Sequence, residues 1–87
     1  MNDDSSLAKQ PLAKLVRRRL QVLFDELGSN HAPDLYRRVM GEVERVLIIE
    51  ALERAGGSQV RAARILGIHR NTLRGRMRKL AIGPPGK

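Results

Sequence analysis

The stretch SQVRAARILGIHRNTLRGRMRKL, residues 58–80, is divided by Gly67 into two short helical patterns. Ser58 suits the N-cap of the first pattern, because a serine hydroxyl can accept a hydrogen bond from a backbone N–H of the first turn. Gly67 suits a turn that needs a left-handed backbone. Two short helices joined by such a turn are typical of a helix-turn-helix, and a plain αα-hairpin in a small bundle is the alternative. The residues that we expect to face inward are Ala62, Ala63, Ile65, Leu66, Ile68, Leu73, Met77 and Leu80.

The net charge of +8 is confined to the C-terminal third of the chain. Residues 1–57 contain nine basic and nine acidic side chains, whereas residues 58–87 contain eight basic and no acidic ones. Such a one-sided distribution predicts a polyanion as the partner. A solvated basic surface without a partner is the alternative interpretation.

The second helical pattern carries its basic side chains on one surface. With a turn of about 100° per residue and Leu73 facing inward, most polar side chains of residues 69–79 lie on the outer surface. In a helix-turn-helix the second helix enters the major groove, and its N-terminal residues meet base edges. We predict that Arg70 and Arg74 read bases, because an arginine fork fits guanine, and that Arg76, Arg78 and Lys79 contact phosphates. The full set of predicted DNA-binding residues is Ser58, Gln59, His69, Arg70, Asn71, Thr72, Arg74, Arg76, Arg78 and Lys79.

Two longer helices are predicted upstream of this unit. Apolar residues recur at steps of three and four from Leu12 to Leu27, after Pro11 and before Gly28, which indicates an amphipathic helix. A basic amphipathic helix on a membrane surface would show a similar pattern, but a stripe that faces the core explains it as well. A second helix is expected from residue 33 to about residue 55, where two glycines end it.

The second half of that long helix, VLIIEAL at residues 46–52, has Glu50 as its one polar residue. A helix that is apolar almost all round must be covered on all sides. Because the other helices of so short a chain are too few to cover it, we predict a homodimer in which this helix crosses its counterpart. The expected interface residues are Leu35, Val39, Val43, Val46, Leu47, Ile49 and Leu52.

These patterns predict an all-α fold, in which a four-helix subunit with a C-terminal helix-turn-helix forms an intertwined homodimer. We expect a mobile N-terminal segment at residues 1–9, dimerisation helices at 10–57, the helix-turn-helix at 58–82 and a mobile tail at 83–87. The sequence has no cysteine, a polar N-terminus and no apolar run that could span a bilayer. It therefore predicts a cytoplasmic protein without disulfides.

The combination of DLYRRVMGEVE (34–44) and VRAARILGIHRNTLRGRMRKL (60–80) resembles the Fis family of bacterial nucleoid-associated, DNA-bending proteins. The resemblance extends from Gln10 to about Ile82. It implies a dimer whose first two helices form the core and whose paired helix-turn-helix units bend DNA, in nucleoid organisation and transcription regulation. The helix-turn-helix alone is also similar to the C-terminal domain of NtrC-type transcriptional activators, so a stand-alone domain of that type is an alternative. RNA polymerase is a further candidate partner.

Carried over by position, Arg70 matches the family's base-reading arginine. The residues that match the family's polar and basic DNA surface are Thr72, Arg74, Arg76, Arg78 and Lys79. Four residues depart from the family pattern: Val60 replaces an expected hydroxyl, Gly75 an expected lysine, His69 an asparagine or serine, and Val46 a proline of some members. Ten residues precede Pro11, so we expect the N-terminal arms that contact DNA invertases in the family to be missing.

Other classes of function have weaker support in the sequence. His31 and His69 are the only imidazoles, no acidic residue lies near His69, and no glycine-rich phosphate loop is present. We therefore predict no catalytic residue, no cofactor, no metal site and no small-molecule substrate. An RNA-binding module would need exposed aromatic side chains, which we do not expect, and a basic protein-interaction module is a further alternative. The predicted partners are double-stranded DNA and a second copy of the chain, and not a membrane.

Overall fold

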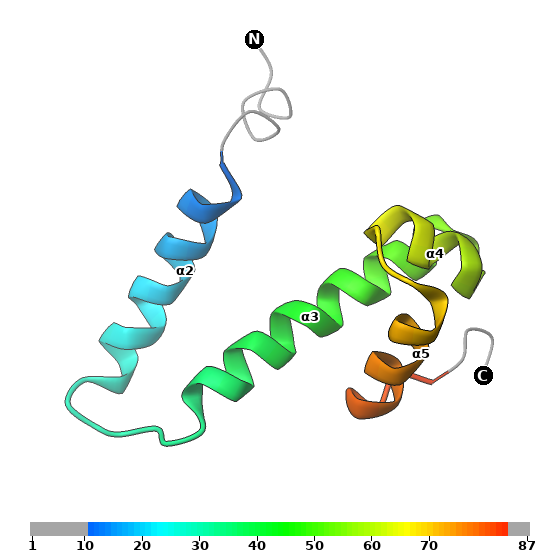
Figure 1. Cartoon of the computed structure of the whole chain (residues 1–87). Coiled ribbons are helices and arrows are strands. Elements are labelled where there is room, and N and C mark those ends of the chain that lie inside the picture. Colours follow the sequence, from blue (N-terminus) through cyan, green and yellow to red (C-terminus); the bar gives the residue numbers. More distant parts are fainter. Residues whose placement is uncertain (1–10, 84–87) are drawn as a thin grey trace, which may run out of the picture. The chain divides into compact units, whose positions relative to one another are not determined.

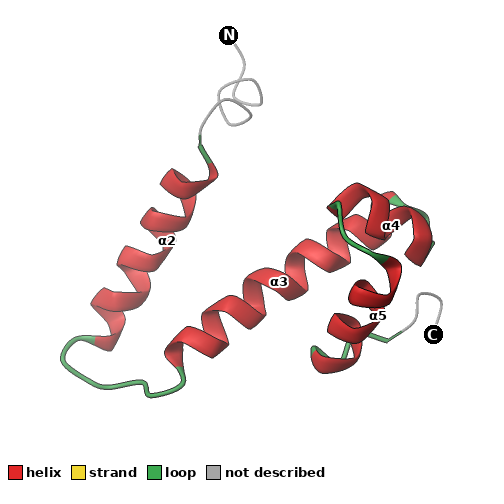
Figure 2. Cartoon of the chain, in the orientation of Figure 1, coloured by secondary structure: helices red, strands yellow, loops and turns green. Residues whose placement is uncertain are grey.

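The computed structural model describes residues 11–83, and these residues form four α-helices and no strand (Figures 1 and 2). The helices are α2 (Leu12–Leu27), α3 (Leu35–Arg54), α4 (Gln59–Leu66) and α5 (Arg70–Lys79). The predicted all-α fold is thereby confirmed. The mobile segment predicted at residues 1–9 and the part of the predicted tail at 84–87 lie outside the described residues. Within residues 11–83, no helix combines the length and the apolar character that crossing a membrane requires.

The chain divides after Pro33 into two units. Helix α2 belongs to the first unit, and α3, α4 and α5 together belong to the second. We had placed the boundary between residues 57 and 58, with α3 on the side of the dimerisation helices. That division stays a prediction; in the structure the C-terminal part of α3 also supplies the apolar surface on which α4 packs.

A small apolar core joins the three helices of the second unit. Its members come from α3 and its C-cap, from α4 and from α5, and none of them is more than 6% exposed. Half of them are alanines, which let neighbouring helices approach closely, and Leu73 is fully buried. The core residues are Ile48, Ala51, Leu52, Ala55, Ala62, Ala63, Leu73 and Met77, and Leu66, Leu80 and Ile82 pack around them.

Two residues that we predicted to face inward are exposed. Ile65 is 55% exposed and Ile68 is 37% exposed. At about 100° per residue, Ala62, Ala63 and Leu66 share the inward side of α4, which leaves Ile65 on the flank of the helix. The short α4 therefore needs only its small residues and one leucine to close the core.

Helix α3 carries apolar side chains on two faces. Ile48 and Leu52 lie in the core, and Leu52 is 6% exposed, so most of its side chain is already covered within the chain and we leave it out of the proposed dimer interface. Val43, Val46 and Leu47 lie on another face and are 49%, 58% and 55% exposed. Within the described part of the second unit, α4 and α5 leave this second face of α3 largely exposed.

Candidate nucleic-acid interface

The turn between α4 and α5 is built around Gly67, which has a left-handed backbone with φ 73° and ψ 28°. The backbone N–H groups of Gly67 and Ile68 donate to the carbonyl oxygens of Arg64 and Ala63, at 3.2 and 3.0 Å. These two hydrogen bonds satisfy carbonyl groups of the last turn of α4. Glycine suits this conformation because it has no Cβ to clash. The turn therefore sets the direction in which α5 leaves α4, as predicted for a helix-turn-helix.

His69 is the N-cap of α5. Its Nδ1 accepts a hydrogen bond from the backbone N–H of Asn71, at 3.2 Å. Because Nδ1 is the acceptor, a neutral ring carries its proton on Nε2, which is a donor. The residue is exposed. His69 thus fixes the first turn of α5 and still has a donor available to a ligand.

Ser58 is the N-cap of α4, as predicted. Its hydroxyl oxygen accepts a hydrogen bond from the backbone N–H of Arg61, at 3.2 Å. The first N–H groups of a helix have no partner within the helix, so the backbone of Gln59 and Val60 adds donors at this end. Ser58 and Gln59 are half-buried, whereas Val60 is exposed.

The outer face of α5 consists almost entirely of hydrogen-bond donors. Leu73 and Met77 occupy the buried face of the helix. We use the term α5 donor surface for the exposed residues Arg70, Asn71, Thr72, Arg74, Arg78 and Lys79. Within residues 11–83 no salt bridge involves any of these side chains. Gly75 lies beside this surface, and a Cβ built on it would meet nothing within 4 Å, so packing within the chain does not require glycine there.

Arg76 is placed differently from the other basic residues of α5. Its Nε donates to Oε2 of Glu44 at 2.6 Å, and its Nη2 donates to Oε1 of Glu44 at 2.5 Å. The hydrogen bond from Arg76 is the largest cause that lowers the pKa of Glu44, and the charges of Arg76 and Lys79 add to it against partial desolvation. The same pair raises the pKa of Arg76. We had assigned Arg76 to phosphate contacts, but here its guanidinium is engaged by α3.

A second contact joins α3 to the end of α5. Arg45 Nη1 donates to the carbonyl oxygen of Leu80, the C-cap of α5, at 2.7 Å. The Leu80 side chain also lies above Gly41, 4.0 Å from the position that a Cβ would take. A basic side chain at this position suits the partial negative charge at the C-terminus of a helix. Gly41, Glu44 and Arg45 therefore form one surface of α3 that holds the last turn of α5.

The two aromatic residues are exposed, contrary to our expectation. Tyr36 is 80% exposed and Phe24 is 55% exposed. Tyr36 lies in the first turn of α3 and Phe24 lies in α2. Neither belongs to the α5 donor surface, so that surface itself offers no aromatic ring for base stacking.

Comparison with known proteins identifies the family. Residues 39–80 match the family described as bacterial regulatory protein, Fis family. The DNA-binding protein Fis of Actinobacillus succinogenes is 35% identical over 82 residues, which cover 94% of this chain and 83% of that protein. The chain belongs to the Fis family. The Fis proteins of Histophilus somni and Proteus mirabilis are each 34% identical, and the matches cover 85% and 84% of their lengths.

The match to the Fis family coincides with one part of the structure. Residues 39–80 include most of α3 and all of α4 and α5. Both partners of the Glu44–Arg76 pair lie within this range. The resemblance that we noted in the sequence is thus confirmed, and the likeness to whole Fis proteins extends beyond the helix-turn-helix.

Sequence reasoning did not identify Glu44 and Arg45 as part of this site. They lie 32 and 35 residues from their partners, in a helix that we had assigned to dimerisation alone. A usable signal was Gly41, because a glycine inside a helical pattern often marks a close approach by another element. In the structure that element is Leu80.

Proposed function

We propose that this chain is a dimeric DNA-binding and DNA-bending protein, which acts in nucleoid organisation and transcription regulation in the bacterial cytoplasm. The observation that carries the proposal is the α5 donor surface, whose four cations form no salt bridge within residues 11–83. It lies on the second helix of a helix-turn-helix, which is the element that enters the major groove in such proteins. The likeness to Fis proteins along most of the chain favours this function over that of an NtrC-type activator domain.

Different parts of the surface have different proposed roles. Arg70 and Arg74 are one turn apart at the N-terminal half of α5, where side chains meet base edges. An arginine fork that binds guanine O6 and N7 contributes about 1–3 kcal/mol of discrimination. Arg78 and Lys79 lie in the last turn and are assigned to phosphates, which position the protein without reading sequence. The remaining contacts are assigned to His69, Asn71, Thr72, Ser58 and Gln59.

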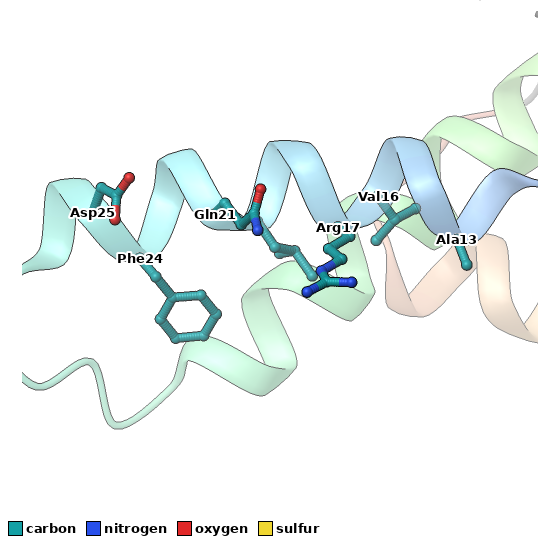
Figure 3. A pocket seen from close by; sticks show the side chains of 7 residues that line it. Ala13, Val16, Arg17, Gln21, Phe24 and Asp25 are labelled. Atoms are coloured by element: carbon teal, nitrogen blue, oxygen red, sulfur yellow. The ribbon is translucent and has the colours of Figure 1, made fainter.

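The dimer is supported by apolar surface that is exposed on α3 and on α2, each taken by itself, within residues 11–83. On α3 this surface includes Val43, Val46 and Leu47, and we extend it to the half-buried residues Leu35, Val39 and Ile49. On α2 no residue is buried, and Val16 and Phe24 project from the same side of the helix as Ala13 (Figure 3). A second copy of the chain would cover both surfaces. Large exposed apolar patches mark interaction sites of this kind.

DNA bending is the part of the proposal that concerns site selection. A single short recognition helix per subunit offers few side chains to the bases, so sequence discrimination by direct contacts is limited. If the two recognition helices of the dimer lie closer than about 34 Å, which is one turn of DNA, a straight duplex cannot engage both. Curving the duplex costs roughly 1–6 kcal/mol, and additional phosphate contacts on the flanks offset this cost.

The experiment that tests the function is a competition between nucleic acids at one salt concentration. Duplex DNA, single-stranded DNA and double-stranded RNA of equal length compete for the protein against a labelled duplex, and fluorescence anisotropy measures the displacement. We expect duplex DNA to compete best. Equal competition by RNA would favour an RNA-binding module, and absence of binding to any of the three would favour a protein-interaction module. The proposal assigns no catalytic step to the chain.

A further inference from the structure

The Glu44–Arg76 pair separates Arg76 from the other cations of α5. Two hydrogen bonds connect the same two groups, and a paired fork of this kind fixes orientation as well as distance. The side chains of Arg76 and Glu44 are 40% and 29% exposed, so solvent reaches the pair only in part. The other salt bridge within residues 11–83 joins Glu50 and Arg54 at 3.8 Å, within α3 and with both side chains largely exposed.

The pair lies where it can control the direction of α5. Helix α4 packs on both α3 and α5, so the start of α5 is positioned by the turn at Gly67 and by the core. The far end of α5 is held to α3 by the Glu44–Arg76 pair and by the hydrogen bond from Arg45 to the Leu80 carbonyl. An element held at both ends has a defined angle to its support.

We propose that Glu44 and Arg76 form a strut that sets the angle of the recognition helix to α3, and that Arg76 is a positioning residue and not a phosphate contact. This proposal rests on the proposed function, in which α3 also supplies the dimer interface. In a dimer joined through α3, the angle between α3 and α5 fixes the separation of the two recognition helices. That separation determines how far the DNA must bend. The strut therefore contributes to the preference for sites that bend easily.

The chemistry of the pair distinguishes this role from that of a phosphate contact. The carboxylate of Glu44 occupies the Nε and Nη2 edge of the Arg76 guanidinium, so Arg76 cannot offer that paired edge to a phosphate without breaking two charged hydrogen bonds. Arg78 and Lys79 have no such partner within the described residues. Lys79→Ala should therefore reduce the slope of log affinity against log salt by about 0.9, whereas Arg76→Ala should leave the slope unchanged.

The first test compares variants of the strut on two DNA duplexes with identical flanks, one with an A/T-rich centre and one with a G/C-rich centre. In Glu44→Gln and Arg76→Lys we expect the affinity ratio between the two duplexes to change about 3- to 30-fold, a range typical of coupled positions. Arg76→Lys keeps the charge but loses the fork, so it separates a strut from a simple charge. Glu50→Gln is the matched control, because its salt bridge stays within α3, and its ratio should equal that of the unmodified protein.

The bend itself is measured by energy transfer between dyes at the two ends of each duplex. The double variant Glu44→Gln with Arg76→Lys should change the bend no more than either single variant, because both remove the same strut. If the bend and the affinity ratio were unchanged in both single variants, the proposed strut would be wrong, but the proposal that the chain binds DNA would stand. A lower salt slope in Arg76→Ala, equal to that of Lys79→Ala, would also overturn it.

A measurement without DNA tests whether the strut forms, separately from whether the proposed function is correct. The carboxyl carbon of Glu44 is followed by NMR as the pH is lowered, in the unmodified protein and in Arg76→Ala. We expect the pKa of Glu44 to lie below its ordinary value in the former and to move up towards that value in the latter. An ordinary pKa for Glu44 in the unmodified protein would show that the strut does not form, whatever the DNA experiments give.

Discussion

Replacing Leu47 by arginine should convert the proposed dimer into monomers or unfold it. Leu47, Val43 and Val46 are about half exposed in the single chain. Full burial of such a side chain stabilises by about 1.5–3 kcal/mol, so covering the exposed half contributes about 1 kcal/mol per residue. Three residues from each of two subunits then contribute about 6 kcal/mol to association. Leu47→Arg removes about 2 kcal/mol of this and places two unpaired charges in an apolar contact, which costs several kcal/mol more.

Sedimentation equilibrium measures the association, and circular dichroism reports whether the helices persist. Ile65→Arg is the matched control, because Ile65 is also 55% exposed but lies on α4, outside the proposed interface. We expect Ile65→Arg to stay dimeric and Leu47→Arg to sediment as a monomer or to lose helical signal. If Leu47→Arg dimerised as tightly as the control, or if the unmodified chain were a folded monomer at micromolar concentration, the assignment of this face would be wrong.

Four further outcomes are expected. Arg70→Ala should lose about 1–3 kcal/mol on a preferred site and little on random DNA, whereas Lys79→Ala should weaken both equally; binding titrations on the two DNAs decide this. Ala81, just after α5, is exposed and has a positive φ of 57°, a conformation that strains the backbone of an alanine. Ala81→Gly should therefore stabilise the fold by about 0.5–1 kcal/mol in urea titrations, and a lower stability of this variant would show that the alanine is not strained. Because the pKa of Glu44 is lowered in the folded state, its ion pair contributes stability above the ordinary glutamate pKa and loses it as the pH falls through the lowered value. Glu44→Gln should remove this part of the acid destabilisation in thermal melts at several pH values. Sites with A/T-rich centres should bind more tightly and be bent in gels of circularly permuted fragments, and unbent complexes indifferent to the centre would contradict this.

The local features of this chain were predictable because their causes lie within a few residues. Ser58 caps the helix that follows it, and Gly67 adopts the left-handed turn that its position between two apolar patterns indicated. The spacing of Leu73 and Met77 correctly identified the buried face of α5. In each case one residue type is favoured by the backbone or by the helical period, so the sequence alone carries the information.

The features that were not predictable depend on which helix covers which. Leu52 and Val46 look alike in the apolar run of α3, but Leu52 lies in the core and Val46 is exposed. Ile65 is apolar and was therefore expected to face inward, although two alanines and Leu66 already fill the inward side of α4. Arg76 was grouped with the other cations of α5, since nothing near it in sequence shows that an acid 32 residues away binds it.

The position of Glu44 on α3 relates the buried face of that helix to its exposed apolar face. One face of α3 is buried in the core of the helix-turn-helix, and another is the apolar face that we assign to the partner subunit. Glu44 lies beside Val43 of the apolar face and binds the last turns of α5. A change in how the two subunits pack along α3 should therefore alter the angle of the recognition helix, through the Glu44–Arg76 pair and the neighbouring hydrogen bond from Arg45 to Leu80. Substitutions at Val43 should consequently alter DNA bending even where the dimer persists, whereas substitutions at Ile65, which takes part in neither contact, should not.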